Sequence, residues 1–247
     1  MKQGNSQSGN VLFLILIAVV LFGALIFAVT MSSRGQGGEE VNREHARLAA
    51  SQLAQHSIDL ERAVVKLRVG SGIADHAISF ETIALPGYAN PDCTNETCKI
   101  FAPSGGQASY IRPKREWLNQ ANAAQAHFGE WLFTGTTCIP GIGLGNDANC
   151  NADNNNLEII AIVPWVTRSL CIEIDNRLGI PLDNGGPPKA AGSAWAAANP
   201  EFTGTFGGGE TLIDAGNVLF GQAEGCFEGG GTPPAGSYHY YSVLYPR

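Results

Sequence analysis

VLFLILIAVVLFGALIFAV, residues 11–29, is the stretch around which the rest of the chain is arranged. Its nineteen residues carry no charge and no strongly hydrogen-bonding side chain. As an α-helix rising about 1.5 Å per residue it would measure roughly 28 Å, close to the thickness of the hydrocarbon core of a bilayer. The sequence therefore predicts a transmembrane helix over residues 10–33 that anchors the rest of the chain.

The part of the chain that follows has the composition of one globular domain. The protein has 247 residues, and about 175 remain after the N-terminal helical part, enough to bury one core. Only 15% of the residues are charged and 31 are glycine, which indicates a weakly charged, turn-rich surface. The formal net charge of −7, with no basic cluster, argues against nucleic acid as a partner.

The six cysteines all follow the apolar stretch and are even in number, which predicts three disulfides formed in an oxidising compartment. Six cysteines allow 15 connectivities. The short spacings favour two local pairs and leave a third long-range pair, namely Cys93 with Cys98, Cys138 with Cys150, and Cys171 with Cys226. The alternative to disulfides is a set of buried free thiols. A zinc site is not predicted, because the sequence has no C-x-x-C pair and no paired histidines at the spacing of zinc ligands.

The N-terminus has a second feature besides its apolar helix. Residues 1–9 form a short polar leader that contains Lys2 and ends in Gly9, and the apolar run starts one residue after Asn10. This arrangement resembles the type IV prepilin and pseudopilin family. In that family a prepilin peptidase cuts after the glycine, and the apolar helices then assemble as the core of a filament.

The resemblance implies roles for particular residues of this chain. Gly9 and Asn10 would flank the processing site, and the apolar helix would contact other pilin-like subunits. Family members commonly carry Phe at the first mature position and Glu at the fifth, where this chain has Asn10 and Leu14. The missing Glu favours a minor or atypical member over a major subunit.

The predicted location follows from the anchor and the cysteines. We expect an inner-membrane protein with a periplasmic domain, which later joins a filament at the cell surface. The positive-inside tendency opposes this orientation, because Lys2 precedes the helix while Arg34, Arg43 and Arg47 follow it. The disulfide-type domain, together with the dedicated machinery that sets topology in the family, outweighs that count.

Beyond the anchor the sequence predicts a glycine-rich break at residues 34–38, an amphipathic helix at 39–70 and a globular domain at 71–247. The helix is inferred from apolar residues at steps mostly of three, four or seven, which are Val41, Leu48, Leu53, Leu60, Val64 and Leu67. Residues 112–128 suggest a short surface helix, 157–163 a central buried strand, 166–178 an amphipathic helix, and 237–247 a last strand. The predicted fold is α+β and pilin-like, with the long helix packed on an antiparallel sheet that carries long disulfide-bonded loops.

One loop resembles a calcium-binding template. Hard-oxygen side chains alternate along it and end in a glutamate at the twelfth position, as Asp147, Asn149, Asn151, Asp153, Asn155 and Glu158. The template's turn glycine is replaced by Ala152, and such residues are also ordinary turn material. Calcium is therefore one possible ligand, an ordinary loop is the alternative, and no other cofactor is predicted.

Motifs of catalysis do not emerge from the sequence. It lacks the zinc-protease, nucleophile-elbow, Walker and dinucleotide patterns, and its five histidines are scattered. We therefore expect a structural filament subunit and not an enzyme. The alternatives are an uncleaved membrane-anchored periplasmic protein that binds a ligand or calcium, and a membrane-tethered hydrolase without a known motif.

Overall fold

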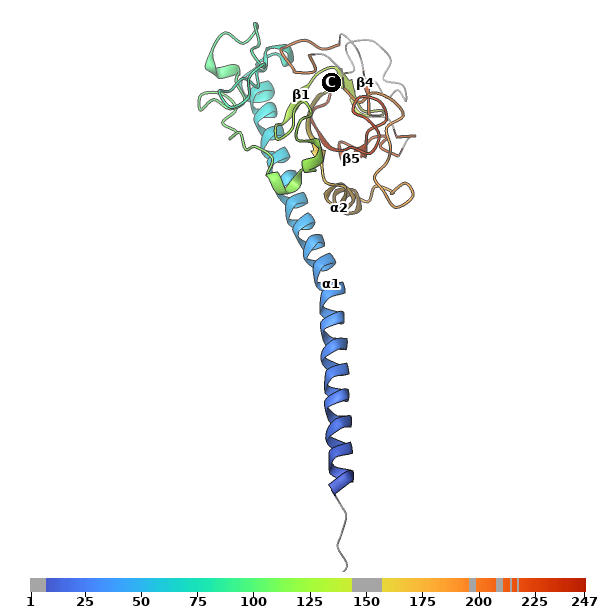
Figure 1. The fold of residues 1–247 in the computed structure, drawn as a ribbon. Coiled ribbons are helices and arrows are strands. Elements are labelled where there is room, and N and C mark those ends of the chain that lie inside the picture. The colour runs from blue at the N-terminus through green and yellow to red at the C-terminus, as the bar shows by residue number, and fades with distance from the viewer. Residues whose placement is uncertain (1–7, 144–156, 196–198, 208–210, 214, 217) are drawn as a thin grey trace, which may run out of the picture. The chain divides into compact units, whose positions relative to one another are not determined.

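The computed structural model describes residues 8–143, 157–195, 199–207, 211–213, 215–216 and 218–247. Residues 8–12, 28–41, 211 and 212 are described by their backbone alone. The chain divides into two compact units, residues 1–45 and 46–247, and each is described by itself. Among the described residues, all strands and the second α-helix belong to the second unit (Figure 1).

The first helix, α1, runs from Ser8 to Val65 and continues as a π-helical turn, Lys66–Gly70. It includes residues 34–38, where the sequence predicts a glycine-rich break, so that break is absent from the backbone. A glycine costs about 1 kcal/mol relative to alanine inside a helix, which weakens a helix without forbidding it.

The prediction of a transmembrane helix over residues 10–33 is wrong. Over the residues that the structure describes, no helix has both the length and the apolar character needed to cross a membrane. The fold class and the inner-membrane location that depended on this helix are therefore not supported.

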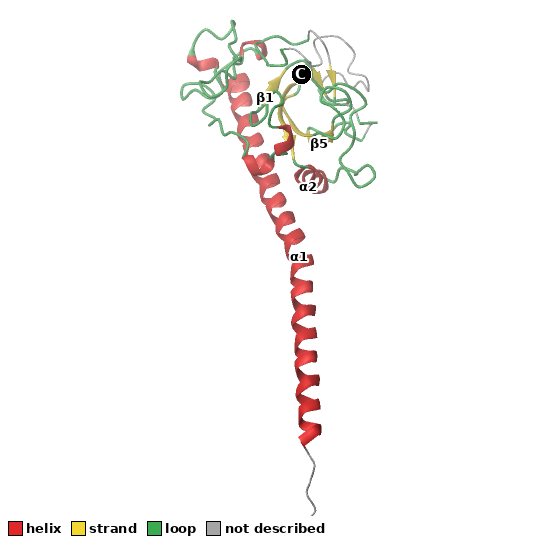
Figure 2. Ribbon diagram, viewed as in Figure 1, coloured by secondary structure: helices red, strands yellow, loops and turns green. Residues whose placement is uncertain are grey.

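The α+β character of the prediction holds, since the structure contains both helices and strands (Figure 2). The described strands include an antiparallel sheet of four in the order β1-β3-β6-β5. The four strands are β1 (Leu132–Thr134), β3 (Ile159–Val166), β6 (Tyr238–Tyr245) and β5 (Glu224–Glu228). A small parallel pair joins β2 (Thr137–Cys138) to β4 (Thr211–Leu212), and α2 (Arg168–Leu178) contacts β5 and β6. The predicted central strand and last strand correspond to β3 and β6, which pair with each other.

Successive side chains along β3 enter two different cores, which shows that both faces of the sheet are buried at this strand. Ile159, Ala161 and Val163 join a core that includes buried residues of α1, whereas Ile160 and Ile162 join a second core. The second core contains residues of the 180–219 region. A strand buried on both faces requires the nearly continuous apolar run that its sequence shows.

Within the second unit, α1 packs on the first core through a mixture of large and small side chains. Leu53, Leu60, Val64 and Leu67 are fully buried, as the sequence predicts. Leu48 is 58% exposed, contrary to the prediction. Alanines at 46, 49, 50, 54 and 63 are buried instead, and their small size allows the helix to approach its neighbours closely.

The region between α1 and β1 is mostly irregular. Residues 112–128, predicted as a helix, contain only two 3₁₀ turns, Arg115–Trp117 and Gln120–Asn122. The side chain of Asn119 accepts a hydrogen bond from Ala121 N and so favours a turn over a longer helix. Trp117 is nevertheless buried.

Candidate functional site

The first candidate surface is the apolar part of α1 in the first unit. All residues from 13 to 27 are exposed, and the large apolar side chains range from 38% exposed for Ile17 to 71% for Phe22. Apolar patches of this size on a protein surface usually mark interaction sites. The exposed segment 13–27 is therefore the strongest indication of a binding surface in the chain.

The predicted processing residues lie at the beginning of this helix. Gly9 and Asn10 are in its first turn, which begins at Ser8, and only their backbone is described. Leu14, the fifth residue after Gly9, is 61% exposed. The surface near this end of the helix is thus apolar.

The disulfides form the covalent framework of the second unit. Cys93 is bonded to Cys98, and Cys171 of α2 is bonded to Cys226 of β5. These are two of the three pairs that the spacing favours. Cys138 is also disulfide-bonded, and Cys150, its expected partner, lies outside the described residues. Such bonds indicate an oxidising environment.

The calcium loop falls mostly outside the described residues, which include none of Asp147, Asn149, Asn151 and Asp153. Glu158 is described and fully buried, and its Oε2 accepts a hydrogen bond from Ile139 N at 3.3 Å. Burial raises the pKa of the Glu158 carboxyl to about 8, which favours the protonated form, a poor calcium ligand. Among the described residues, no three His, Cys, Asp or Glu side chains gather into a metal site.

One buried pair has the residue types of a catalytic dyad. His239 Nε2 lies 2.7 Å from Ser237 Oγ, while Nδ1 accepts a hydrogen bond from Trp165 N at 3.3 Å. Because Nδ1 is an acceptor, the proton of the neutral ring resides on Nε2, which then donates to the serine and cannot remove its proton. Burial also lowers the pKa of His239 well below its usual range. The pair therefore acts as a buried structural contact.

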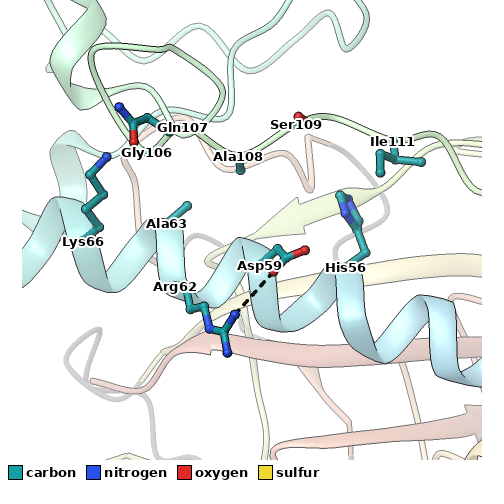
Figure 3. Close-up of a pocket in the computed structure, with 10 residues that line it drawn as sticks. All are labelled: His56, Asp59, Arg62, Ala63, Lys66, Gly106, Gln107, Ala108, Ser109 and Ile111. Atoms are coloured by element: carbon teal, nitrogen blue, oxygen red, sulfur yellow. Dashed lines mark ion pairs between the residues drawn. The ribbon is translucent and has the colours of Figure 1, made fainter.

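A groove of about 410 Å³ lies beside α1 in the second unit (Figure 3). One wall is formed by α1 and its continuation, through His56, Asp59, Arg62, Ala63 and Lys66. The other wall is formed by the irregular segment 106–111. Figure 3 shows Lys66 extending from the helix toward Gly106 and Gln107 at one end, and the His56 ring pointing toward Ile111 at the other.

The charges in the groove are unevenly distributed. Arg62 Nη1 lies 3.7 Å from Asp59 Oδ1, and Lys66 forms no ion pair with any described residue. Burial lowers the pKa of His56, an effect that the charge of Asp59 partly opposes, so His56 is mainly neutral at pH 7. The end of the groove near Lys66 is therefore positive.

No motif in the sequence predicts this groove. Its wall 106–111 contains no recognisable motif, and only folding brings that segment beside the helix. The one available signal was the helical spacing of Asp59, Arg62 and Lys66, three and four residues apart, which places them on neighbouring turns of one face.

No family model matches the sequence, and comparison with curated proteins and with solved structures finds no significant match. The class of protein is therefore defined by the features described above. The chain is a disulfide-bonded α+β protein with an exposed apolar segment in its N-terminal helix and a partly cationic groove in its second unit.

Proposed function

We propose that the protein is a structural subunit of a type IV pilus-like or pseudopilus-like filament, assembled through segment 13–27. The observation that carries the proposal is the exposure of twelve large apolar side chains along this segment. Burying one such side chain yields roughly 1.5–3 kcal/mol, so contact with equivalent segments of other subunits supplies a large driving force.

The sequence of the leader supports the same proposal. A polar leader that ends in Gly9 immediately precedes the helix, as in substrates of prepilin peptidase. Removal of residues 1–9 would place the apolar segment close to the new N-terminus. The disulfides are compatible with a filament exposed to an oxidising medium.

The first test is the mass of the mature chain in cells with and without prepilin peptidase. We expect a peptidase-dependent loss of residues 1–9, with Asn10 or its N-methyl form as the first residue. Gly9→Leu should block the cleavage, whereas Gly4→Leu, a matched change inside the leader, should leave it intact. An uncleaved chain in both strains would remove the support for the pilin pathway.

The second test addresses assembly. Leu21→Glu introduces a charge into the exposed apolar segment and should abolish filaments seen by electron microscopy. Ile83→Glu is the matched control, because Ile83 is fully exposed on a turn of the second unit. Equal loss of filaments in both variants, or filaments that persist in Leu21→Glu, would contradict assembly through segment 13–27.

A further inference from the structure

A modification motif lies on an exposed loop of the second unit. Asn95-Glu96-Thr97 has the pattern Asn-x-Thr, with a residue other than proline in the middle, which is the acceptor pattern for N-linked glycans. No other Asn-x-Ser or Asn-x-Thr occurs in the sequence. All three residues of the motif are exposed in the structure. The motif is therefore accessible to a glycosylating enzyme.

The two ends of the motif are joined through the side-chain amide of Asn95. Its Oδ1 accepts one hydrogen bond from Thr97 N, at 2.9 Å, and another from Thr97 Oγ1. Both bonds draw electron density toward Oδ1 and so polarise the amide, which makes a proton on Nδ2 easier to remove. The hydroxyl two residues after the asparagine therefore activates the nitrogen to which a glycan would be attached.

The nitrogen of this amide is free to react. Asn95 Nδ2 forms no hydrogen bond with any residue that the structure describes. Asn90 shows the opposite arrangement, because it is buried and its Nδ2 donates to His76 O at 2.8 Å and to Ile78 O at 2.7 Å. A bond from Asn95 Nδ2 to a sugar leaves both hydrogen bonds of Oδ1 intact. The loop can therefore carry a glycan without rearrangement.

Contacts on both sides of the motif fix this loop. Cys93 and Cys98 flank the motif and are bonded to each other. The carboxylate of Glu96 forms an ion pair with Lys99 Nζ at 2.6 Å and leaves the amide of Asn95 uncontacted. The disulfide also indicates an oxidising environment, and acceptor motifs that carry glycans lie on surface loops of secreted proteins. The location and the conformation of the loop thus agree with modification at Asn95.

We infer that Asn95 is the acceptor of an N-linked glycan, which an oligosaccharyltransferase transfers from a lipid-pyrophosphate-linked oligosaccharide. In this reaction Nδ2 attacks the anomeric carbon of the first sugar and forms a bond to it. The bond from that carbon to the pyrophosphate oxygen breaks, and its electron pair leaves with the lipid pyrophosphate. The proton lost from Nδ2 passes to a base of the transferase, and nothing is oxidised or reduced. This inference concerns the second unit and does not depend on assembly through segment 13–27.

The test is mass spectrometry of the protein purified from the cells that produce it. Trypsin cleaves after Arg68 and after Lys99, which releases residues 69–99 with the motif and both flanking cysteines. We expect a form of this peptide that is heavier than its sequence by whole sugar residues, with fragmentation assigning the added mass to Asn95. The same peptide shows whether the disulfide of Cys93 with Cys98 has formed.

Variants of the motif test the role of each position. Asn95→Gln and Thr97→Val should each abolish the added mass, whereas Thr97→Ser should retain it because serine keeps the hydroxyl. Thr94→Val, a matched change directly before the motif, should also retain it. All of these positions are exposed, so the variants are expected to fold, and formation of the flanking disulfide verifies the loop in each of them.

Three results would overturn the inference. The first is a peptide 69–99 that carries no added mass in the original protein. The second is added mass located on Thr94 or Thr97, which would indicate an O-linked modification. The third is added mass on Asn95 that persists in Thr97→Val or is lost equally in Thr94→Val, since the hydroxyl of the motif would then not direct the transfer. A glycan on Asn95 that depends on the Thr97 hydroxyl would support it.

Discussion

Asp175 has the most perturbed environment of the acidic residues in α2, and replacing it by asparagine should stabilise the protein at neutral pH. The carboxyl is fully buried, Oδ1 accepts a hydrogen bond from Cys226 N at 2.9 Å, and Oδ2 has no partner among the described groups. It also lies in the last turn of α2, where the helix dipole disfavours a negative charge. Burial raises the pKa of Asp175 to about 8, although the hydrogen bond from Cys226 opposes this effect.

The sign and size of the effect follow from proton linkage. The unfolded chain loses this proton near pH 4, whereas the folded protein keeps it until about pH 8. Between these values folding is coupled to uptake of a proton, so the free energy of unfolding falls by about 1.4 kcal/mol per pH unit. From pH 5 to pH 8 the loss attributable to Asp175 is about 4 kcal/mol.

Asp175→Asn resembles the protonated carboxyl in shape and still offers an oxygen to Cys226 N. We expect the variant to gain stability relative to the original protein as pH rises, by about 4 kcal/mol between pH 5 and pH 8. The measurement is urea unfolding of the full-length protein at several pH values, in non-ionic detergent and with the disulfides intact.

The control for this prediction is Asp92→Asn, at an exposed aspartate of the same unit. It should leave the difference in unfolding free energy nearly independent of pH. If Asp175→Asn and the original protein lose stability in parallel from pH 5 to pH 8, the carboxyl is already ionised in the folded state. The reasoning from its burial would then be refuted.

Three other changes test separate parts of the fold by the same unfolding assay. Glu158→Gln should also become more stable relative to the original protein as pH rises from 5 to 8, because burial raises the pKa of the Glu158 carboxyl to about 8. A difference in unfolding free energy that does not change with pH would contradict this. Leu53→Ala should lower the free energy of unfolding by about 3 kcal/mol, because Leu53 is buried, and Leu48→Ala should lower it by less than about 1 kcal/mol, because Leu48 is 58% exposed. Equal losses in the two variants would contradict the orientation of α1. Replacing both Cys171 and Cys226 by alanine should lower the free energy of unfolding by about 4 kcal/mol, because the disulfide closes a loop with a sequence separation of 55. A negligible loss would contradict a stabilising role for this disulfide.

The sheet was the most predictable part of the fold. The run IIAIV in β3 is apolar at successive positions, and only a strand covered on both faces can bury all of them. The amphipathic helix predicted at 166–178 likewise corresponds to α2, in which Leu170 and Ile174 are buried. In both places the pattern of apolar residues matches the burial of the element that it forms, so local and tertiary preferences agree.

Predictions from α1 were less successful, because large apolar residues alone do not define its buried face. Alanines fill much of the contact with the core, and Leu48 points outward. The predicted membrane span was also wrong: among the described residues no helix is both long and apolar enough to cross a bilayer, although the side chains of segment 13–27 are apolar and exposed. Hydropathy alone therefore did not establish what the apolar side chains contact.

Asp175 was missed although the sequence held a usable signal for it. Residues four apart on a helix share a face, so the disulfide of Cys171 with Cys226 brings the side chain of Asp175 toward the same strand. Cys226 then contacts both residues, through its sulfur and through its backbone N–H. A cysteine on a helix that forms a long-range disulfide thus predicts that the residue one turn later is buried, and a carboxylate at that position predicts stability that falls with rising pH.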